Sequence, residues 1–163
     1  MIRASILFIA LASLATTTAC KKKEGEGGAA GKTSESKAGP TKLPKLGLTI
    51  DVPGEVEIGD AIMGQGHMLQ GAEIGAMQVE IAEKPETLDE AKSDADMYTP
   101  KNLKADKLAD GWALTFENTG SAGANFFVEV RREIGGKTYK CSTTQGDGGR
   151  AATVLAACKS LKK

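Results

Sequence analysis

Hydrophobic and polar residues alternate in short segments along most of this 163-residue chain. A period of two is typical of strands that bury one face. Proline or glycine pairs, such as Pro53-Gly54 and Gly135-Gly136, follow some of these segments and favour tight antiparallel connections. The pattern therefore predicts a mostly antiparallel sheet of five to seven strands, in segments 48–52, 56–58, 77–81, 103–108, 112–117, 126–131 and 139–143.

Two other segments have the period of an α-helix. In the first, Thr87 and Glu90 have capping-box spacing, and Pro100 ends the helical stretch. In the second, apolar residues recur at helical spacing within 154–161, after Asp147 as a possible cap. We therefore expect an α+β fold, in which an inserted helix and a carboxyl-terminal helix pack on the sheet. This single domain is expected to occupy residues 46–163.

The amino terminus indicates export. Arg3 precedes a 12-residue apolar run at 4–15, and a bilayer-spanning helix needs about 20 residues. The run is typical of an export signal, which an ordinary peptidase could remove after Ala15 or Ala19. The sequence TTAC ending at Cys20 also resembles the lipobox of bacterial lipoproteins. This resemblance implies a signal peptide at residues 1–19, and a mature chain that begins at an acylated, palmitate-bearing Cys20.

The number of cysteines favours the lipoprotein interpretation. Cys141 and Cys158 are expected to form a disulfide in an exported protein. A redox or metal-binding pair is less favoured, because the spacing is not CxxC and no histidine is nearby. Without acylation, Cys20 would remain as a free thiol in an oxidising compartment.

Residues 20–45 carry glycine, serine and lysine with few apolar residues, so we expect a disordered tether after the lipidated cysteine. Seven lysines and three glutamates at 21–45 give the tether a net charge of +4, while 13 basic and 18 acidic residues at 46–163 give −5. An acidic folded part gives no support to nucleic-acid binding. Lys21, where an aspartate would retain the protein at the inner membrane by analogy with enteric bacteria, indicates the outer membrane of the cell envelope.

The opening strand LGLTIDVP and the order of elements from Leu46 to Lys163 resemble the PsbP-like superfamily. Members are compact α+β lipoproteins and lumenal proteins with an antiparallel sheet and a carboxyl-terminal helix. The resemblance implies a non-enzymatic accessory or assembly role. The chain also resembles small bacterial lipoproteins in general.

No catalytic, metal-binding or cofactor-binding residue is predicted. His67 is the only histidine, and no nucleophile, base and orienting group can be assembled around it. The expected inserted helix is acidic, but it lacks the glycine and glutamate of a calcium loop, so a solvated face is expected. The segment TTQGDGGR lacks the residues of a phosphate-binding loop, so a turn is expected. The acidic residues of that helix are Asp89, Glu90, Asp94 and Asp96.

Phe127 is a large aromatic residue on the face of its strand that alternation predicts to lie outward. Two explanations stay open: a surface for a partner, or a covering helix. Together these patterns predict a lipid-anchored envelope protein that acts as a non-enzymatic binding or accessory module for an unidentified envelope protein. The alternative is a carrier of a small ligand or metal ion, which would require a pocket in the sheet face.

Overall fold

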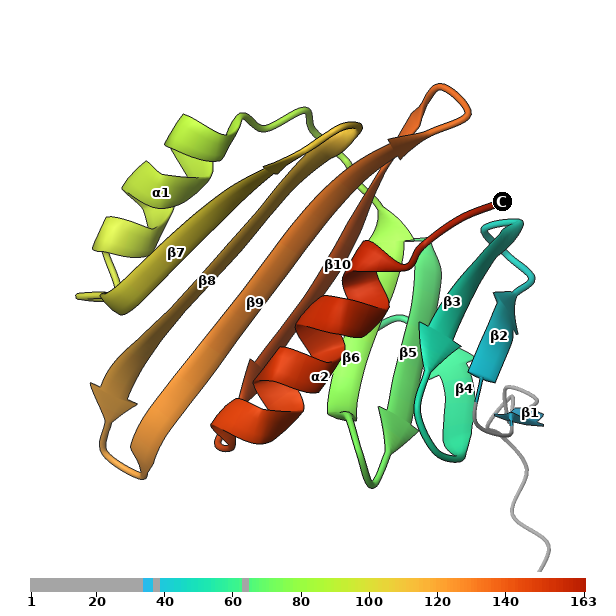
Figure 1. Ribbon diagram of the computed structural model, residues 1–163, viewed down its shortest axis with the longest axis horizontal. Helices are drawn as coiled ribbons and strands as arrows, with labels where there is room; N and C mark the ends of the chain where they lie inside the picture. The colour runs from blue at the N-terminus through green and yellow to red at the C-terminus, as the bar shows by residue number, and fades with distance from the viewer. Residues whose placement is uncertain (1–33, 37–38, 63–64) are drawn as a thin grey trace, which may run out of the picture. The chain divides into compact units, whose positions relative to one another are not determined.

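The computed structural model describes residues 34–36, 39–62 and 65–163 (Figure 1). Within these residues the fold is α+β, with mostly antiparallel sheet and two helices, which confirms the predicted class. The elements are β1 (Ser34–Ser36), β2 (Gly39–Leu43), β3 (Leu48–Val52), β4 (Val56–Asp60), β5 (Gly66–Gly71), β6 (Gly75–Ile81), α1 (Leu88–Asp96), β7 (Lys101–Leu108), β8 (Gly111–Gly120), β9 (Gly123–Ile134), β10 (Lys137–Gln145) and α2 (Gly148–Lys159).

Eight strands form one antiparallel sheet in the order β1-β4-β5-β6-β10-β9-β8-β7. Strands β2 and β3 form a separate antiparallel hairpin. In Figure 1, α2 and this hairpin lie in front of the sheet, while α1 lies beside β7 and β8 at the upper left. Helix α2 packs on the long central strands β9 and β10.

The structure contains three strands beyond the seven that alternation predicts. Strand β5 falls in a glycine-punctuated segment, and β1 and β2 fall in the expected tether. Thr41 and Leu43 of β2 are 1% and 0% exposed, so this strand belongs to the core of the domain. Regular structure and core packing therefore begin before residue 46, because β2 pairs with β3 and Leu43 joins the main core.

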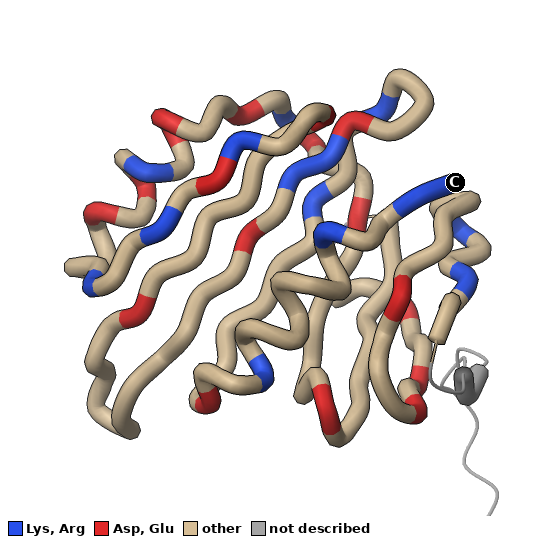
Figure 2. The backbone as a smooth tube through the Cα atoms, in the orientation of Figure 1, with Lys and Arg blue, Asp and Glu red and all other residues tan. Residues whose placement is uncertain are grey.

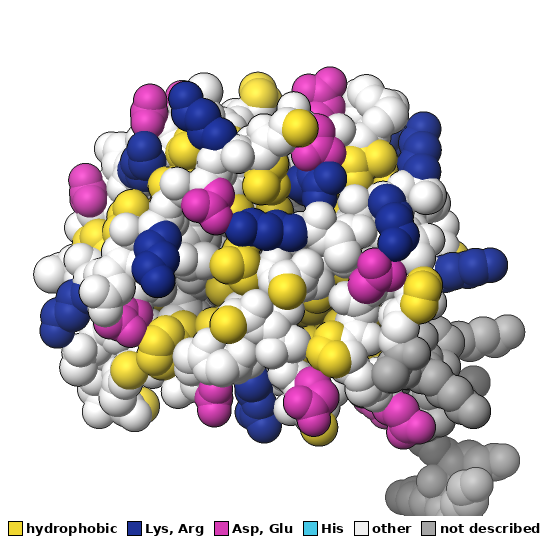
Figure 3. All heavy atoms as spheres, in the orientation of Figure 1, with side chains coloured by type: hydrophobic (Ala, Val, Ile, Leu, Met, Phe, Trp, Pro, Cys, Tyr) yellow, Lys and Arg dark blue, Asp and Glu magenta, His cyan; other side chains and the backbone are white. Residues whose placement is uncertain are grey.

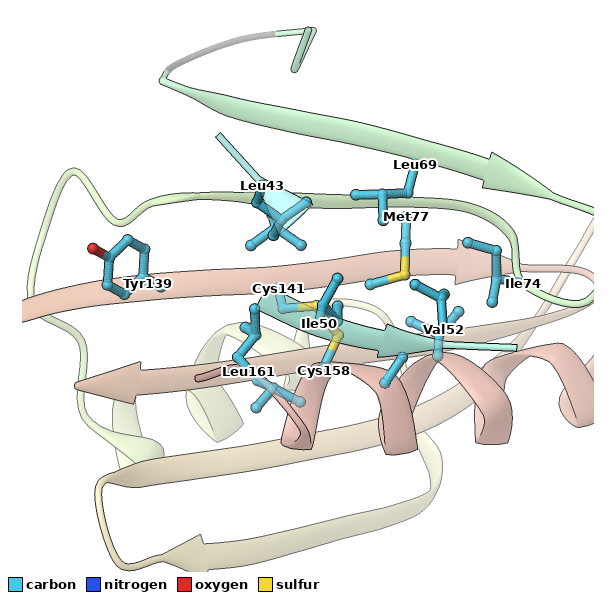
Figure 4. Close-up of a cluster of buried hydrophobic side chains, with 14 of the residues drawn as sticks. Leu43, Ile50, Val52, Leu69, Ile74, Met77, Tyr139, Cys141, Cys158 and Leu161 are labelled. Carbon is cyan, nitrogen blue, oxygen red and sulfur yellow. A yellow bond between two sulfur atoms is a disulfide. The ribbon is translucent and has the colours of Figure 1, made fainter. Parts of the chain in front are cut away.

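The main hydrophobic core fills the space between the sheet and its cover of α2 and the β2–β3 hairpin (Figure 4). The close-up shows side chains from the sheet, from the β2–β3 hairpin and from α2 meeting around the sulfur atoms of Cys141 and Cys158. These two residues join β10 to α2, with a Cα–Cα distance of 5.6 Å, and both are fully buried. The labelled residues of this core include Leu43, Ile50, Leu69, Met77, Tyr139 and Leu161.

Helix α1 packs against the opposite face of the sheet. Ala91 and Ala95 contact a second core cluster that contains Trp112 and Leu114, whereas Ala113 between them joins the main core. Successive side chains of a strand point to opposite faces, so α1 and α2 cover different faces. The predicted capping box is present: Thr87 Oγ1 accepts from the Glu90 backbone N–H, and the Glu90 carboxylate accepts from the Thr87 N–H.

Charged residues are spread over the described part of the chain. Figure 3 shows that basic, acidic and hydrophobic side chains are interspersed on the face that carries α2. The backbone view in Figure 2 shows several acidic positions along α1 and the segment before it. Neither α1, with 9 residues, nor α2, with 12, meets the length and hydropathy that a bilayer-spanning helix requires; these are the helices of the described residues.

Candidate functional site

A groove lies between α1 and the part of the sheet that α1 leaves uncovered. Two adjoining cavities, of about 610 and 690 Å3, form it. They share Gln78, Glu86, Asp94, Arg131 and Lys140 in their linings, so they are parts of one surface depression. The small side chains of α1 that contact β8 bring the helix close to that strand, and the face of β9, β10 and β6 beyond it stays open.

One end of the groove is aromatic. The rings of Phe116 and Phe127 are stacked, with centroids 4.4 Å apart, and the Tyr98 ring lies 5.5 Å from Phe127. Tyr98 is 51% exposed, so this cluster offers apolar surface to a ligand. Phe127 is therefore neither a fully exposed surface residue nor a residue covered by the carboxyl-terminal helix α2. It is half-buried against Phe116 and Tyr98, on the face opposite α2.

The centre of the groove is organised by Arg131, which is 8% exposed. Its Nε donates to Glu129 Oε1 at 2.9 Å, and its Nη1 donates to the Lys84 carbonyl at 2.9 Å. Its Nη2 forms an ion pair with Glu86. The guanidinium carbon lies 5.7 Å from the centroid of the Trp112 ring. The donors of Arg131 thus hold neighbouring protein groups, so its role in the groove is to position them.

These contacts also fix the segment that enters α1. Trp112 Nε1 donates to the Glu86 carbonyl at 3.0 Å, so residue 86 is held by both its main chain and its side chain. Burial raises the pKa of the Glu86 carboxyl, although the neighbouring Arg131 favours the charged form. The approach to α1 is therefore attached to the sheet through a small, mostly buried polar network.

The groove carries a net negative charge. Its lining contains six acidic and three basic residues, which gives a net charge of −3. The acidic residues are Glu80, Glu83, Glu86, Glu90, Asp94 and Glu129, and the basic ones are Lys84, Arg131 and Lys140. Lys140 Nζ lies 3.5 Å from Glu129 Oε2, and Arg131 is paired as described, so two of the three cations already face protein carboxylates.

The groove lining offers contacts suited to binding. Ser142 and Thr144, which share the face of β10 that carries Lys140, line its β10 wall. Among the described residues, the lining includes no histidine or cysteine that could activate their hydroxyl groups. Within the same residues, no group of three or more histidine, cysteine, aspartate or glutamate side chains is placed to hold a metal ion.

His67 is placed as a structural residue on β5, away from the groove. It is 4% exposed, and its Nε2 accepts from the Lys45 N–H at 3.1 Å while Nδ1 lies 3.3 Å from the Gly59 carbonyl. The two contacts are satisfied together by the neutral ring with its proton on Nδ1. Burial lowers the pKa of His67, the Gly59 carbonyl opposes this, and the Lys45 ammonium lowers it further.

These contacts predict a pH dependence of stability. A histidine whose folded pKa is lowered stabilises the fold fully above its unfolded pKa of about 6.5, and that stability is lost as the pH falls through 6.5. We expect the free energy of unfolding, measured in urea, to decrease between pH 7.5 and 5.5, and His67→Gln to remove most of this slope. The ion pair of Lys45 with Asp60 changes little there, because the pKa of Asp60 is lowered. An unchanged slope in the variant would contradict the assignment.

The structure places the other predicted residues as follows. Cys20 lies outside the described residues. The acidic residues of α1 divide: Glu90 and Asp94 line the groove, whereas Asp89 pairs with Lys92. In TTQGDGGR, the Asp147 side chain accepts from the Arg150 N–H at 3.0 Å and caps α2. Asp96 is exposed and lies outside both cavity linings.

Sequence reasoning missed the groove itself, together with Arg131, Glu86 and Glu129. The alternation of Phe127, Glu129 and Arg131 along the strand indicated only that these side chains share its outward face. It gave no indication that a groove lies over that face. Comparison with known proteins adds no relative: the chain matches no protein-family model and no curated protein sequence.

Proposed function

We propose that this chain is a bacterial lipoprotein, anchored to the cell envelope through an acylated Cys20, whose domain acts as a non-enzymatic binding module. The anchor is supported by the short apolar run, by the TTAC sequence and by the cysteine count. Since Cys141 and Cys158 lie at disulfide distance in the core, Cys20 is the remaining cysteine of the chain. The PsbP-like resemblance belongs to this proposal as the fold family that suits an accessory role.

The observation that carries the binding role is the groove between α1 and the sheet. It combines half-exposed aromatic rings with carboxylates on a rigid antiparallel scaffold. Concave sites of about 300–1,000 Å3 with apolar walls and a few polar groups are typical binding sites. Position supports the same role: 13 residues separate Cys20 from Ser34, and 13 extended residues span at most about 45 Å. An anchor at Cys20 would therefore keep Ser34 within about 45 Å of the membrane, where a partner in the envelope would meet the domain.

One experiment in intact cells tests both halves of the proposal. A photoreactive phenylalanine analogue replaces either Tyr98 in the groove or Ala156, which is exposed on α2. We expect adducts from position 98 and few from position 156. Each variant is also made with Cys20→Ser, which is expected to move the protein from the membrane fraction to the soluble fraction and to abolish palmitate labelling.

The membrane fractionation tests the anchor and the adduct yields test the groove, so either part of the proposal can be wrong without the other. Membrane retention of Cys20→Ser would overturn the anchor and leave the groove untouched. Equal adduct yields from positions 98 and 156 would overturn the groove as the binding site and leave the anchor untouched. Ala30→Ser, which keeps Cys20 and lies between the anchor and the first described strand, is the control that should stay with the membrane.

A small-ligand carrier is the second candidate, because each of the two cavities is large enough by itself for a small molecule. Mass spectrometry of protein purified from membranes under native conditions distinguishes the two. A carrier would retain a ligand of defined mass, whereas a protein-binding module would be recovered without one. Carriage of a metal ion has no supporting cluster in the described part of the chain.

A further inference from the structure

One wall of the groove carries three side chains at regular spacing. Glu90 and Asp94 lie four residues apart on α1, and Tyr98 follows after four more. The Tyr98 N–H donates to the Ala95 carbonyl at 2.9 Å, in a three-residue turn that follows the end of α1. With a rise of about 1.5 Å per residue, Glu90 and Asp94 are about 6 Å apart along the helix, and Tyr98 lies in the turn just beyond its end. All three line the groove, in the order acid, acid, aromatic.

The electrostatics of the groove select a cation. Arg131 is held by Glu86 and Glu129, and it does not offset the other carboxylates. Asp94 has no ion pair within the described residues, and it lines both cavities. The excess of three negative charges over the lining also repels the anionic headgroups of a membrane surface. The complementary ligand therefore carries positive charge near Asp94.

The aromatic end of the groove adds a second requirement. Tyr98 is half-exposed and lies next to the stacked pair of Phe116 and Phe127, so a large apolar side chain placed there would bury aromatic surface. A simple inorganic cation would leave this end empty. A ligand that uses the whole groove is therefore amphipathic, with cationic groups toward Glu90 and Asp94 and an apolar group toward Tyr98.

We propose that the groove binds an extended peptide segment of a partner protein, with two basic residues and one aromatic or large aliphatic residue at alternate positions. Alternate side chains of an extended chain point the same way and are about 6.6–7 Å apart, close to the spacing along α1. The partly buried Ser142 lines the same cavity on the opposite, β10 wall of the groove. This inference rests on the proposed function and names the ligand class of the same groove.

The test uses the chain with Cys20→Ser, to keep it in solution, and a blocked peptide Lys-Thr-Lys-Thr-Phe. Binding is measured by calorimetry, and its position by amide chemical shifts in the NMR spectrum. We expect Asp94→Asn to weaken binding about threefold to tenfold and Tyr98→Ala about tenfold, since buried aromatic anchors dominate such contacts. The matched control is Asp96→Asn, which removes the same charge from the same helix outside the groove and should change binding less than twofold.

The ligand class is tested by three further titrations. Raising the salt concentration from 50 to 300 mM should weaken binding severalfold, because the groove is open to solvent and its charges are screened. The peptide Glu-Thr-Glu-Thr-Phe and anionic phosphatidylglycerol vesicles should not bind. Equal effects of Asp94→Asn and Asp96→Asn, or equal binding of the acidic peptide or the vesicles, would overturn this inference. If that occurs while adducts still form at position 98, the groove remains the binding site and only the ligand class is wrong.

Discussion

Arg131→Met is expected to lower the free energy of unfolding by about 2–3 kcal/mol at pH 7, since leaving a partly buried polar group without its partner costs roughly 1–3 kcal/mol. Methionine fills most of the space but donates no hydrogen bond. Glu86 and Glu129 would then be left without the guanidinium that neutralises them, and the Lys84 carbonyl would lose its donor. Most of the lost stability is expected from leaving these two carboxylates and this carbonyl without a partner, and less from the loss of the ion-pair attraction itself.

The pH dependence of this variant identifies the cause. Burial already raises the pKa of Glu86, and removing Arg131 removes the main influence that lowers it. A carboxyl with a raised folded pKa stabilises the fold fully below its unfolded pKa, and this stability is lost as the pH rises through the folded pKa. The deficit of Arg131→Met relative to wild type should therefore shrink as the pH is lowered from 7 to 5.

Urea-induced unfolding followed by far-ultraviolet circular dichroism at the two pH values measures both effects. Arg150→Met is the control, since Arg150 is exposed at the start of α2 and its replacement should change stability by at most about 0.5 kcal/mol. A loss in Arg131→Met no larger than in Arg150→Met would show that the network around Glu86 does not hold α1 to the sheet.

The seven strands with clear alternation were predictable because their burial follows from local sequence. Strand β2 was not, because its two buried side chains, Thr41 and Leu43, stand among prolines and lysines that dominate the composition. Leu43 is buried only because β2 pairs with β3 and the hairpin packs over the sheet. Composition averaged over residues 20–45 therefore hid a short strand whose burial depends on tertiary contacts.

Strand β5 was ambiguous because its glycines suggest turns. In the structure these glycines permit close packing: a Cβ at Gly66 would lie 2.1 Å from the Val79 carbonyl oxygen, and one at Gly71 would lie 2.7 Å from that of Glu55. Each position is in a strand of the sheet and is crowded by neighbouring backbone. A single sequence does not distinguish a glycine required by close approach from one required by a turn.

The groove escaped prediction for a different reason. Its central contact joins Glu86 to Arg131, which are 45 residues apart, and alternation only placed Arg131 on the outer face of its strand. Whether that face is open or covered depends on where α1 docks. Docking in turn depends on the match between the small residues Ala91 and Ala95 and the Trp112–Leu114 surface. The acidic and aromatic residues of α1 were visible in the sequence, but their common orientation toward a cavity was not.

The second large effect is expected at the junction of β10 and α2. Replacing Cys141 and Cys158 together by alanine should lower the free energy of unfolding by about 3 kcal/mol, which is the loop-closure contribution for a bridge over about 15 residues. For a domain of this size such a loss corresponds to roughly 10 °C in Tm. Both residues are fully buried, so the variant also loses packing between the helix and the sheet.

Differential scanning calorimetry of the Cys20→Ser protein, with and without reductant, separates the bond from the packing. Reductant should lower the Tm of the parent by several degrees and leave the Cys141→Ala/Cys158→Ala variant unchanged. Mass spectrometry after alkylation in denaturant should detect no free thiol in the oxidised parent. Two alkylated cysteines would mean that the buried sulfur atoms lie close without a bond. In that case the cysteine count would no longer single out Cys20, and the lipid anchor would rest on the apolar run and the TTAC sequence alone.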